Sequence, residues 1–316
     1  MTVSESLAAG TVPRKYGTWQ QVTIAVEDDR WTVLGGGPGG CHPRGFSRRL
    51  RYMIEINGRQ ATAQDIQALG LCNYGNFTSM RVEGMRVRGL ALHLQRLSLD
   101  AYALFGIELD TDHVRWLVRR FAGRIESPST VRVTIFDSAG TVDRPGVTAQ
   151  PDIVVSARNA PRMDNISPVR VQTVFHQREL PNVKHVGLFG SLNCRRSAQL
   201  RGYDDALFVD SCSHVTEGPT WNIGFFDGTK ILWPKADILS GVTMSLLREI
   251  TSESGLASVE NVIHVPQISD TWAAFATNAS VGVRPIKAID QVELRASDPI
   301  LRDLQLWHTA LPGEAL

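Results

Sequence analysis

The sequence contains little cysteine. Four cysteines occur among its 316 residues, at Cys41, Cys72, Cys194 and Cys212. They lie far apart, and none belongs to a Cys-x-x-Cys pair or to a spacing typical of metal ligands. Disulfide-stabilised domains carry a much higher share of cysteine. We therefore expect neither a disulfide framework nor a bound metal ion.

An excess of charge of one sign and a long apolar run are also missing. Lys and Arg number 33 against 32 Asp and Glu, which gives a net charge of +1 and argues against a nucleic-acid partner. No apolar run approaches the roughly 18–20 residues of a membrane span. The first residues lack the basic and apolar regions of a secretory signal. With 43% hydrophobic residues the chain can still bury a core, so we expect a folded cytoplasmic protein without a membrane partner.

The first 52 residues differ from the rest. Seven basic residues against four acidic ones give this segment a charge of +3 and leave the remainder at −2. A glycine-rich stretch spans residues 35–40, but Cys41-His42-Pro43 follows it where a phosphate-binding loop needs Lys and Ser or Thr. This pattern predicts a flexible N-terminal extension, residues 1–52. Residues 20–24 and 30–34 could form a short hairpin within it.

From Met53 onward, period-2 and helical patterns are interleaved without strict βαβ alternation, which predicts an α+β fold in two lobes. Residues 157–168 carry two prolines and no periodicity, so we expect a linker there, between a small lobe at 53–160 and a larger lobe at 161–316. Strands are expected at 53–56, 77–82, 85–88, 130–136, 152–156, 169–174, 206–209, 222–226 and 231–233. Helices are expected at 92–104, 111–125, 192–201 and 243–254.

Three segments of the second half carry candidate chemistry. Lys184 alternates with apolar neighbours in residues 180–187, and burial there lowers the pKa of an amine, as Schiff-base chemistry requires. Glu217 lies in residues 215–222, at the mouth of an expected strand pair. Residues 239–243 form a glycine turn that opens a helix with a hydroxyl, a site where backbone N–H groups and the helix dipole bind anions.

Five motifs in this order resemble the class IV (fold type IV) pyridoxal-phosphate enzymes. This family includes branched-chain aminotransferases, D-amino-acid transaminases, (R)-selective amine transaminases and aminodeoxychorismate lyase. The resemblance covers about residues 53–316 and rests on His93-x-x-Arg96-Leu97, Lys184, Gly202-x-Asp204-Asp205-Ala206-Leu207, Val215-Thr216-Glu217-Gly218-x-x-x-Asn222 and Leu239-x-Gly241-Val242-Thr243. It implies a small N-terminal α/β lobe, a larger β-barrel-like lobe with helices, a homodimer, and pyridoxal 5′-phosphate as cofactor.

The resemblance also implies a role for each residue. Lys184 is the catalytic residue that binds the cofactor as a Schiff base and moves a proton. Glu217 binds the pyridine nitrogen, which keeps the ring an electron sink. Arg96 clamps the phosphate with its fixed set of donors. The other implied cofactor-binding residues are Asn222, Val242, Thr243 and Ala279, and the implied substrate-binding residues are Phe77, Arg132, Trp221 and Ser280.

Several of these residues have a plainer interpretation. Arg132 stands among alternating apolar residues, so it faces either solvent or an anion; in branched-chain aminotransferases a similarly placed Arg holds a dicarboxylate. Phe77 and Trp221 could belong to the core. Ser240 replaces the proline usual in the glycine turn, and Phe77-Thr78-Ser79-Met80 is closer to aminodeoxychorismate lyase than to the transaminases.

The expected function is a pyridoxal-phosphate-dependent aminotransferase that moves an amino group from an amino acid or amine to a 2-oxo acid. The alternative within enzymes is a lyase of the aminodeoxychorismate type, which eliminates pyruvate to form 4-aminobenzoate. A cofactor-binding protein without turnover is the alternative of a different class, although Lys184 and Glu217 argue against it.

Overall fold

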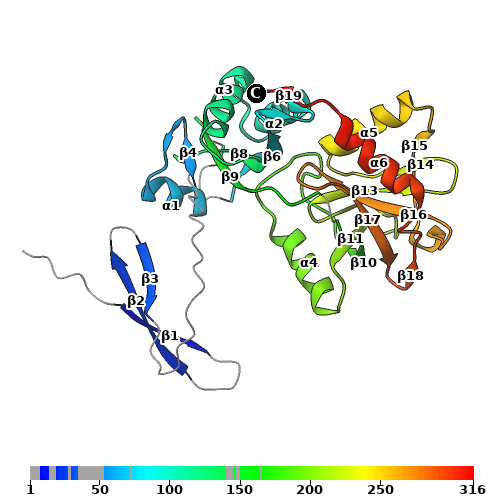
Figure 1. Cartoon of the computed structure of the whole chain (residues 1–316), viewed down its shortest axis with the longest axis horizontal. Coiled ribbons are helices and arrows are strands. Elements are labelled where there is room, and N and C mark those ends of the chain that lie inside the picture. Colours follow the sequence, from blue (N-terminus) through cyan, green and yellow to red (C-terminus); the bar gives the residue numbers. More distant parts are fainter. Residues whose placement is uncertain are drawn as a thin grey trace, which may run out of the picture. The chain divides into compact units, whose positions relative to one another are not determined.

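The structure is a computed structural model that describes residues 8–13, 19–27, 30–34, 53–71, 73–139, 145–146, 150–163 and 166–316. It divides into two units, Met1–Arg51 and Tyr52–Leu316. In the first unit only the backbone of three antiparallel strands is described, β1 (Ala8–Pro13), β2 (Trp19–Glu27) and β3 (Arg30–Leu34) (Figure 1). The pairing of β2 with β3 confirms the expected hairpin, whereas the glycine-rich stretch at 35–40 lies outside the described residues.

The second unit begins with a seven-stranded sheet in the order β19-β7-β6-β8-β9-β4-β5. In the hairpin turn Asn57-Gly58 both residues have positive φ, 48° and 79°, the backbone that a two-residue hairpin requires. The strands are β4 (Ile54–Ile56), β5 (Arg59–Gln60), β6 (Gly75–Glu83), β7 (Arg86–Val87), β8 (Ser129–Phe136), β9 (Asp152–Asn159) and β19 (Glu314–Ala315).

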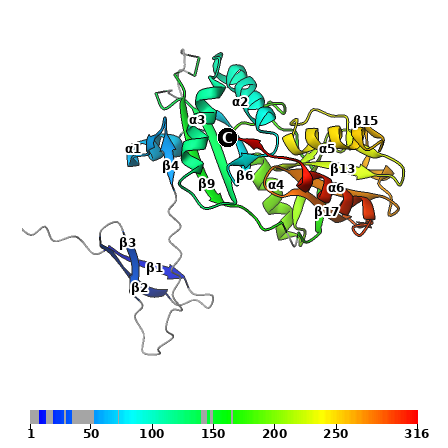
Figure 2. The same cartoon turned by 45° about the horizontal axis from the view of Figure 1, so that its top comes forward.

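Three helices accompany this sheet: α1 (Ala63–Leu71), α2 (Leu90–Phe105) and α3 (Thr111–Ala122). Helices α2 and α3 bury an apolar stripe against β6, β8 and β9 (Figure 2), and Leu97, Phe121 and Val131 at this contact are fully buried. The C-terminal strand β19 returns to pair with β7 and forms one edge of this sheet, whose other edge is β5.

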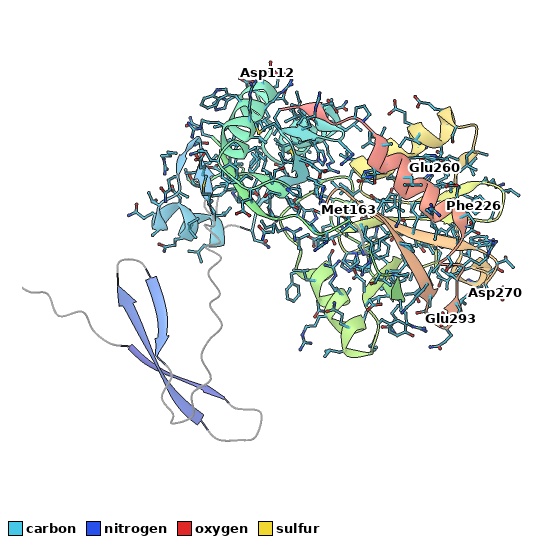
Figure 3. All side chains as sticks on the ribbon, in the orientation of Figure 1. Asp112, Met163, Phe226, Glu260, Asp270 and Glu293 are labelled. Atoms are coloured by element: carbon cyan, nitrogen blue, oxygen red, sulfur yellow. The ribbon has the colours of Figure 1, made fainter. Side chains whose placement is uncertain are left out.

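The chain crosses from the first sheet to the second near Met163 (Figure 3). The second sheet has the order β11-β10-β17-β16-β13-β14-β15, with β12 on β13 and β18 on β17. Its strands are β10 (Val169–Phe175), β11 (Asp205–Val209), β12 (Glu217–Gly218), β13 (Trp221–Phe226), β14 (Ile231–Pro234), β15 (Ser258–Asn261), β16 (Ala273–Asn278), β17 (Gly282–Ile289) and β18 (Val292–Glu293).

Helices cover the second sheet as well. Helix α4 (Phe189–Leu200) packs on β11 through Ala198, and α5 (Val242–Glu253) and α6 (Pro299–Ala310) pack on β16 and β17 through Leu247 and Leu304. A short 3₁₀ helix, η1 (Val265–Gln267), follows β15. Within the described part of the chain, no helix combines the length and the apolarity that crossing a membrane requires.

The α+β architecture with two sheets agrees with the expectation, and the elements named from the sequence lie within about three residues of their expected ends. One expectation was wrong: the linker does not start at residue 157, because β9 stays paired with β8 up to Asn159. Backbone pairing continues from residue 157 to Asn159, although apolar and polar residues no longer alternate in this stretch. The division into lobes at residue 160 stays a prediction.

Candidate active site

A cavity of about 620 Å³ opens where the two sheets of the second unit meet. Its wall comes from β6, β8 and α2 of the first sheet's lobe, and from the loop after β10, the β12–β13 hairpin, the start of α5 and the turn after β16. All of the site residues named from the sequence line this one cavity: Phe77, Arg96, Arg132, Lys184, Glu217, Trp221, Asn222, Val242, Thr243, Ala279 and Ser280.

Lys184 lies in a loop that pairs with the edge of β6. The Phe77 N–H donates to the Lys184 carbonyl over 2.9 Å, and the Lys184 N–H donates to the buried carboxylate of Asp100 over 3.0 Å. Burial lowers the pKa of Lys184 to about 7, with Arg96 and Arg178 adding to the effect and Glu217 opposing it. A neutral, nucleophilic amine is therefore present near pH 7.

Glu217 sits on β12 and is paired with Arg178, a residue that the sequence analysis did not identify. The Arg178 guanidinium donates to Glu217 over 2.8 Å and to the carbonyl of Val183 over 2.9 Å, so it ties the loop of Lys184 to the carboxylate. Burial raises the pKa of Glu217, and the charge of Arg178 opposes that rise. The only sequence signal for Arg178 is its place six residues before Lys184.

The side chain of Asn222 holds the glycine turn that follows β14. Its amide donates to the Leu239 carbonyl over 2.8 Å, while the Leu239 N–H donates to Glu217 over 3.3 Å. A Cβ at Gly241 would lie 2.0 Å from Asn222 Oδ1, so only glycine fits. Asn222 thus shapes the turn and lies within hydrogen-bonding distance, 3.4 Å, of Glu217.

The turn presents the start of α5 to the cavity. Gly241 is the N-cap residue and provides no side-chain acceptor for the first N–H groups of the helix, among them those of Val242 and Thr243. Unpaired N–H groups and the positive end of the helix dipole together form an anion site. Arg96 lies beside it and donates to the Ser240 carbonyl over 3.2 Å, so serine in place of the usual proline leaves the turn intact.

A buried network orients Arg96. Its guanidinium donates to the Thr78 hydroxyl over 3.1 Å, and that hydroxyl lies 2.7 Å from Nδ1 of His93. Thr78 thus connects Arg96 to the buried His93 ring, whose pKa burial lowers well below the ordinary value. Among the described residues, four cavity-lining residues have a buried polar atom without a hydrogen-bond partner: His93 Nε2, Arg96 Nε, Thr130 Oγ1 and Thr277 Oγ1. The Arg96 N–H and the Thr277 hydroxyl are donors that fit a phosphate group.

The part of the cavity wall formed by Arg132, Arg158 and Phe77 carries positive charge. The Arg132 guanidinium carbon lies 3.7 Å from the Phe77 ring centroid, and the Lys184 Nζ lies 4.9 Å from it. Burial lowers the pKa of Arg132 to about 10, and Arg158 adds to this effect. In the part of the chain that the structure describes, neither arginine has a carboxylate partner. This side of the cavity therefore favours an anionic group.

Trp221 and Ser280 also line the cavity. The Trp221 indole donates to Asp205 over 2.9 Å and lies flat on Gly218, where a Cβ would be 2.0 Å from its ring. The Ser280 N–H already donates to the Asn278 side chain over 3.0 Å. The Ser280 N–H is therefore already bonded within the turn that contains Ala279. The Ser280 hydroxyl is the group that can bind a ligand in the cavity.

A family model described as amino-transferase class IV matches residues 75–289. A probable branched-chain-amino-acid aminotransferase of Rickettsia bellii is 34% identical over 101 residues, 32% of this chain and 35% of that protein. The chloroplastic branched-chain-amino-acid aminotransferase 2 of Arabidopsis thaliana is 32% identical over 102 residues, 31% of this chain and 26% of that protein. The matched stretch spans about a third of these relatives or less.

Solved structures share the fold over a larger part of the chain. The branched-chain aminotransferase of Thermoproteus uzoniensis with norvaline has a TM-score of 0.73 at 20% identity, covering 82% of this chain and 93% of that one. The branched-chain amino acid aminotransferase of T.th. with pyridoxamine 5′-phosphate has a TM-score of 0.71 at 17% identity, covering 82% and 93%. A putative 4-amino-4-deoxychorismate lyase of Legionella pneumophila has a TM-score of 0.67 at 22% identity, covering 75% and 91%.

Proposed function

Because the chain belongs to the amino-transferase class IV family, we propose that it is a pyridoxal 5′-phosphate-dependent aminotransferase that moves an amino group from an amino acid or amine to a 2-oxo acid. One observation carries the proposal. A lysine whose pKa is lowered to about 7 faces a cavity that also holds a buried carboxylate and an anion site at a helix N-terminus.

The cavity residues fit the cofactor. Arg96, the first N–H groups of α5 and the Thr277 hydroxyl would hold its phosphate, Glu217 its ring nitrogen, and Lys184 its reactive carbon covalently. When bound, pyridoxal phosphate supplies an electron sink for the substrate α-carbon. The fit is supported by the buried, unpartnered Arg96 Nε and Thr277 Oγ1 and by the helix N-terminus without a side-chain cap.

Each protein group then has a defined task. Because its pKa is lowered to about 7, the amine of Lys184 is partly neutral at that pH and can accept a proton from one carbon and return it to another. The carboxylate of Glu217 is held in place by Arg178 and by the Leu239 N–H. Phe77 and Trp221 provide apolar walls that exclude water from the reacting atoms.

The substrate side of the cavity supports an acidic substrate group. Arg132 and Arg158 face this side without a carboxylate partner among the described residues, and Arg132 stacks on Phe77. A side-chain carboxylate of the amino donor or of the 2-oxo acid would compensate this charge. The dicarboxylate role of Arg132 is therefore part of the proposed function.

An elimination reaction is the second candidate. By the family resemblance, transaminases often carry an acidic residue just after the aromatic one. Thr78 stands at that position here, and its hydroxyl accepts a hydrogen bond from Arg96. The Legionella pneumophila structure, a putative 4-amino-4-deoxychorismate lyase, has a similar fold. Thr78 favours an elimination reaction. Release of pyruvate from aminodeoxychorismate would distinguish elimination from amino transfer.

The test is a single half-reaction with the purified, cofactor-loaded full chain and a set of amino donors. Aminotransfer predicts that the visible absorbance of the cofactor disappears with a donor and returns with a 2-oxo acid. Lys184→Ala should abolish this change, whereas Lys287→Ala, an exposed lysine on β17, should not alter it. Pyruvate release without loss of absorbance would support the lyase, and no response to any substrate would support cofactor binding without turnover.

A homodimer remains part of the proposal. Large apolar side chains are exposed on and beside α4: Phe189 is 80% exposed, Leu200 71% and Phe175 66%. Exposed apolar side chains such as these favour a surface that is covered in a complex, and a second copy of this chain is the occupant expected for this family. Sedimentation analysis of the full chain, with Phe189→Ser as the disrupting variant, tests this point.

A further inference from the structure

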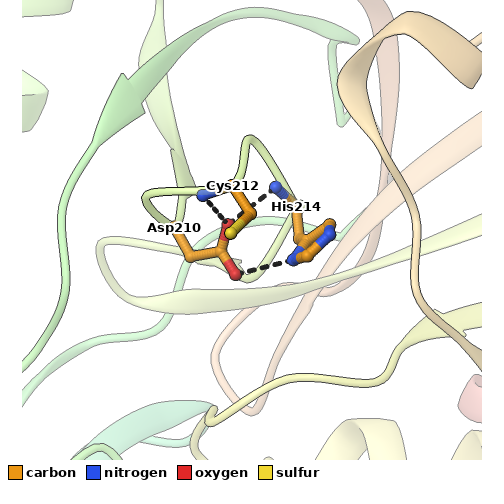
Figure 4. Close-up of side chains that lie close together, drawn as sticks. All are labelled: Asp210, Cys212 and His214. Atoms are coloured by element: carbon orange, nitrogen blue, oxygen red, sulfur yellow. Dashed lines mark hydrogen bonds and ion pairs between the residues drawn. The ribbon is translucent and has the colours of Figure 1, made fainter.

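The turn between β11 and β12 brings three metal-ligating side chains together. Asp210, Cys212 and His214 each offer a ligand atom, and these atoms all lie within 4.8 Å of one another (Figure 4). None of the three lines the cavity that holds Lys184. The cluster is therefore separate from the proposed catalytic site.

The turn holds these side chains on one side. Asp210 Oδ1 accepts the N–H groups of Cys212 and His214, each over 2.8 Å, and Asp210 Oδ2 lies 2.8 Å from His214 Nδ1. Ser213 takes the left-handed conformation, with φ 62°, which closes the turn. The carboxylate is therefore pre-oriented by the turn.

A second segment supports the cluster. The His264 ring lies edge to face on the His214 ring, with centroids 4.3 Å apart, and the backbones of the two residues form a β-bridge. The adjacent Val215 N–H donates to the Ile263 carbonyl over 2.8 Å. His264 thus limits how the His214 ring can turn and brings a second imidazole to the same place.

The chemistry of these ligands selects the ion. Ca²⁺ and Mg²⁺ take oxygen ligands, whereas a thiolate and an imidazole beside one carboxylate suit Zn²⁺ and Co²⁺. Bonds of about 2.0–2.3 Å to a tetrahedral zinc ion place its ligand atoms about 3–4 Å apart. The observed upper limit of 4.8 Å is close to this, so small side-chain rotations suffice. Cys212 is exposed, so an ion can reach the site.

We propose that Asp210, Cys212 and His214 form a Zn²⁺ site at the β11–β12 turn, with the fourth position open to water. This departs from the expectation of no metal, because the alternation Asp-x-Cys-x-His at residues 210–214 is not a spacing typical of metal ligands. On binding, the Cys212 thiol loses its proton to solvent as the sulfur–metal bond forms. The bound ion stabilises this turn, and Glu217 follows three residues after His214.

Cobalt titration of the full, cofactor-loaded chain without an affinity tag tests the site. Bound Co²⁺ should give the intense red-region bands of tetrahedral geometry, which do not overlap the cofactor absorbance, and one equivalent of Zn²⁺ should remove them. Loss of a residue that only hydrogen-bonds a metal ligand lowers the metal affinity by about 10–100-fold. Cys212→Ser and His214→Asn remove ligands themselves, so they should lower the affinity at least as much. Cys194→Ser, at the other described cysteine, should bind as the parent does.

Thermal melting provides the control for folding. In excess chelator, Cys212→Ser and the parent should melt at the same temperature, because the exposed thiol packs against little. Added Zn²⁺ should raise the melting temperature of the parent and leave that of Cys212→Ser unchanged. The proposal is overturned if Co²⁺ gives only the pale spectrum of octahedral coordination, or if Cys212→Ser binds the ion as tightly as the parent.

Discussion

Arg178 donates a 2.8 Å hydrogen bond to Glu217, and the two side chains are only 9% and 7% exposed. A buried ion pair is balanced only while both partners are present, because either charge alone is poorly solvated in the protein interior. Arg178 also binds two carbonyl groups of the loop that carries Lys184, those of Pro181 and Val183. One guanidinium thus connects the Glu217 carboxylate and the loop that carries Lys184.

Replacing Arg178 by Met should destabilise the protein strongly. The change leaves the Glu217 carboxylate buried without its partner, and breaking a buried pair in this way costs about 3–5 kcal/mol. Urea unfolding of the cofactor-free chain measures the loss. The double variant Arg178→Met/Glu217→Gln should recover much of it, since no unpaired charge remains. A loss below about 1 kcal/mol in the single variant would show that the pair behaves as a solvent-exposed one.

Lys184 should make the stability of the cofactor-free chain depend on pH. Its pKa is lowered from 10.5 to about 7 in the folded state, so between these values the unfolded chain binds more protons. Stability therefore rises with pH across this window. Lys184→Met should stabilise the chain most below pH 7 and lose this advantage towards pH 10.5. A difference between variant and parent that stays constant over the window contradicts the lowered pKa.

Arg132 should determine the preference for acidic substrates. A hydrogen bond to a charged group contributes about 1.5–3 kcal/mol, so Arg132→Gln should lower kcat/KM for a dicarboxylic 2-oxo acid by about 10–100-fold. The value for a monocarboxylic 2-oxo acid should change little. Steady-state kinetics with both acceptors measure the ratio. Arg158→Gln, at the exposed neighbour, should have a smaller effect, and equal losses for both acceptors would assign Arg132 a structural role.

Gly241 should not tolerate a side chain. Its φ of −75° is ordinary, so the only obstacle to alanine is the contact of 2.0 Å with Asn222 Oδ1. Gly241→Ala must shift the turn that presents the N-terminus of α5, and the affinity for the cofactor should fall by tenfold or more, about 1.4 kcal/mol. Titration of the cofactor-free chain with pyridoxal phosphate measures this.

Gly70→Ala is the matched control for this substitution. Gly70 lies in α1, has no positive φ, and a Cβ there would meet nothing within 4 Å. Alanine in a helix interior is more favourable than glycine by about 0.5–1 kcal/mol, so this variant should be as stable as the parent or slightly more so. Cofactor affinity should not change. Equal affinities of Gly241→Ala and Gly70→Ala for pyridoxal phosphate would show that the turn does not take part in cofactor binding.

The sequence revealed those site residues whose chemistry follows from their immediate neighbours. Lys184 stands in an apolar run, and residues 239–243 combine a glycine turn with a helix start, so a lowered pKa and an anion site could be predicted. The hairpin at Asn57-Gly58 follows from the φ preferences of these two residues. Thr78 and Asp100 carry no such local signal, because each acts on a residue that only folding brings near, Arg96 and Lys184.

By itself, then, the sequence determined the α+β class, the family motifs and those cavity residues that belong to the motifs. Tertiary structure alone decided how their charges interact. Arg178 and Glu217 are 39 positions apart, and Asp100 and Lys184 are 84 apart. Burial and Coulomb interactions depend on distance in space, not on separation along the chain. The pairing of Glu217 and the value of the Lys184 pKa therefore exist only in the folded chain.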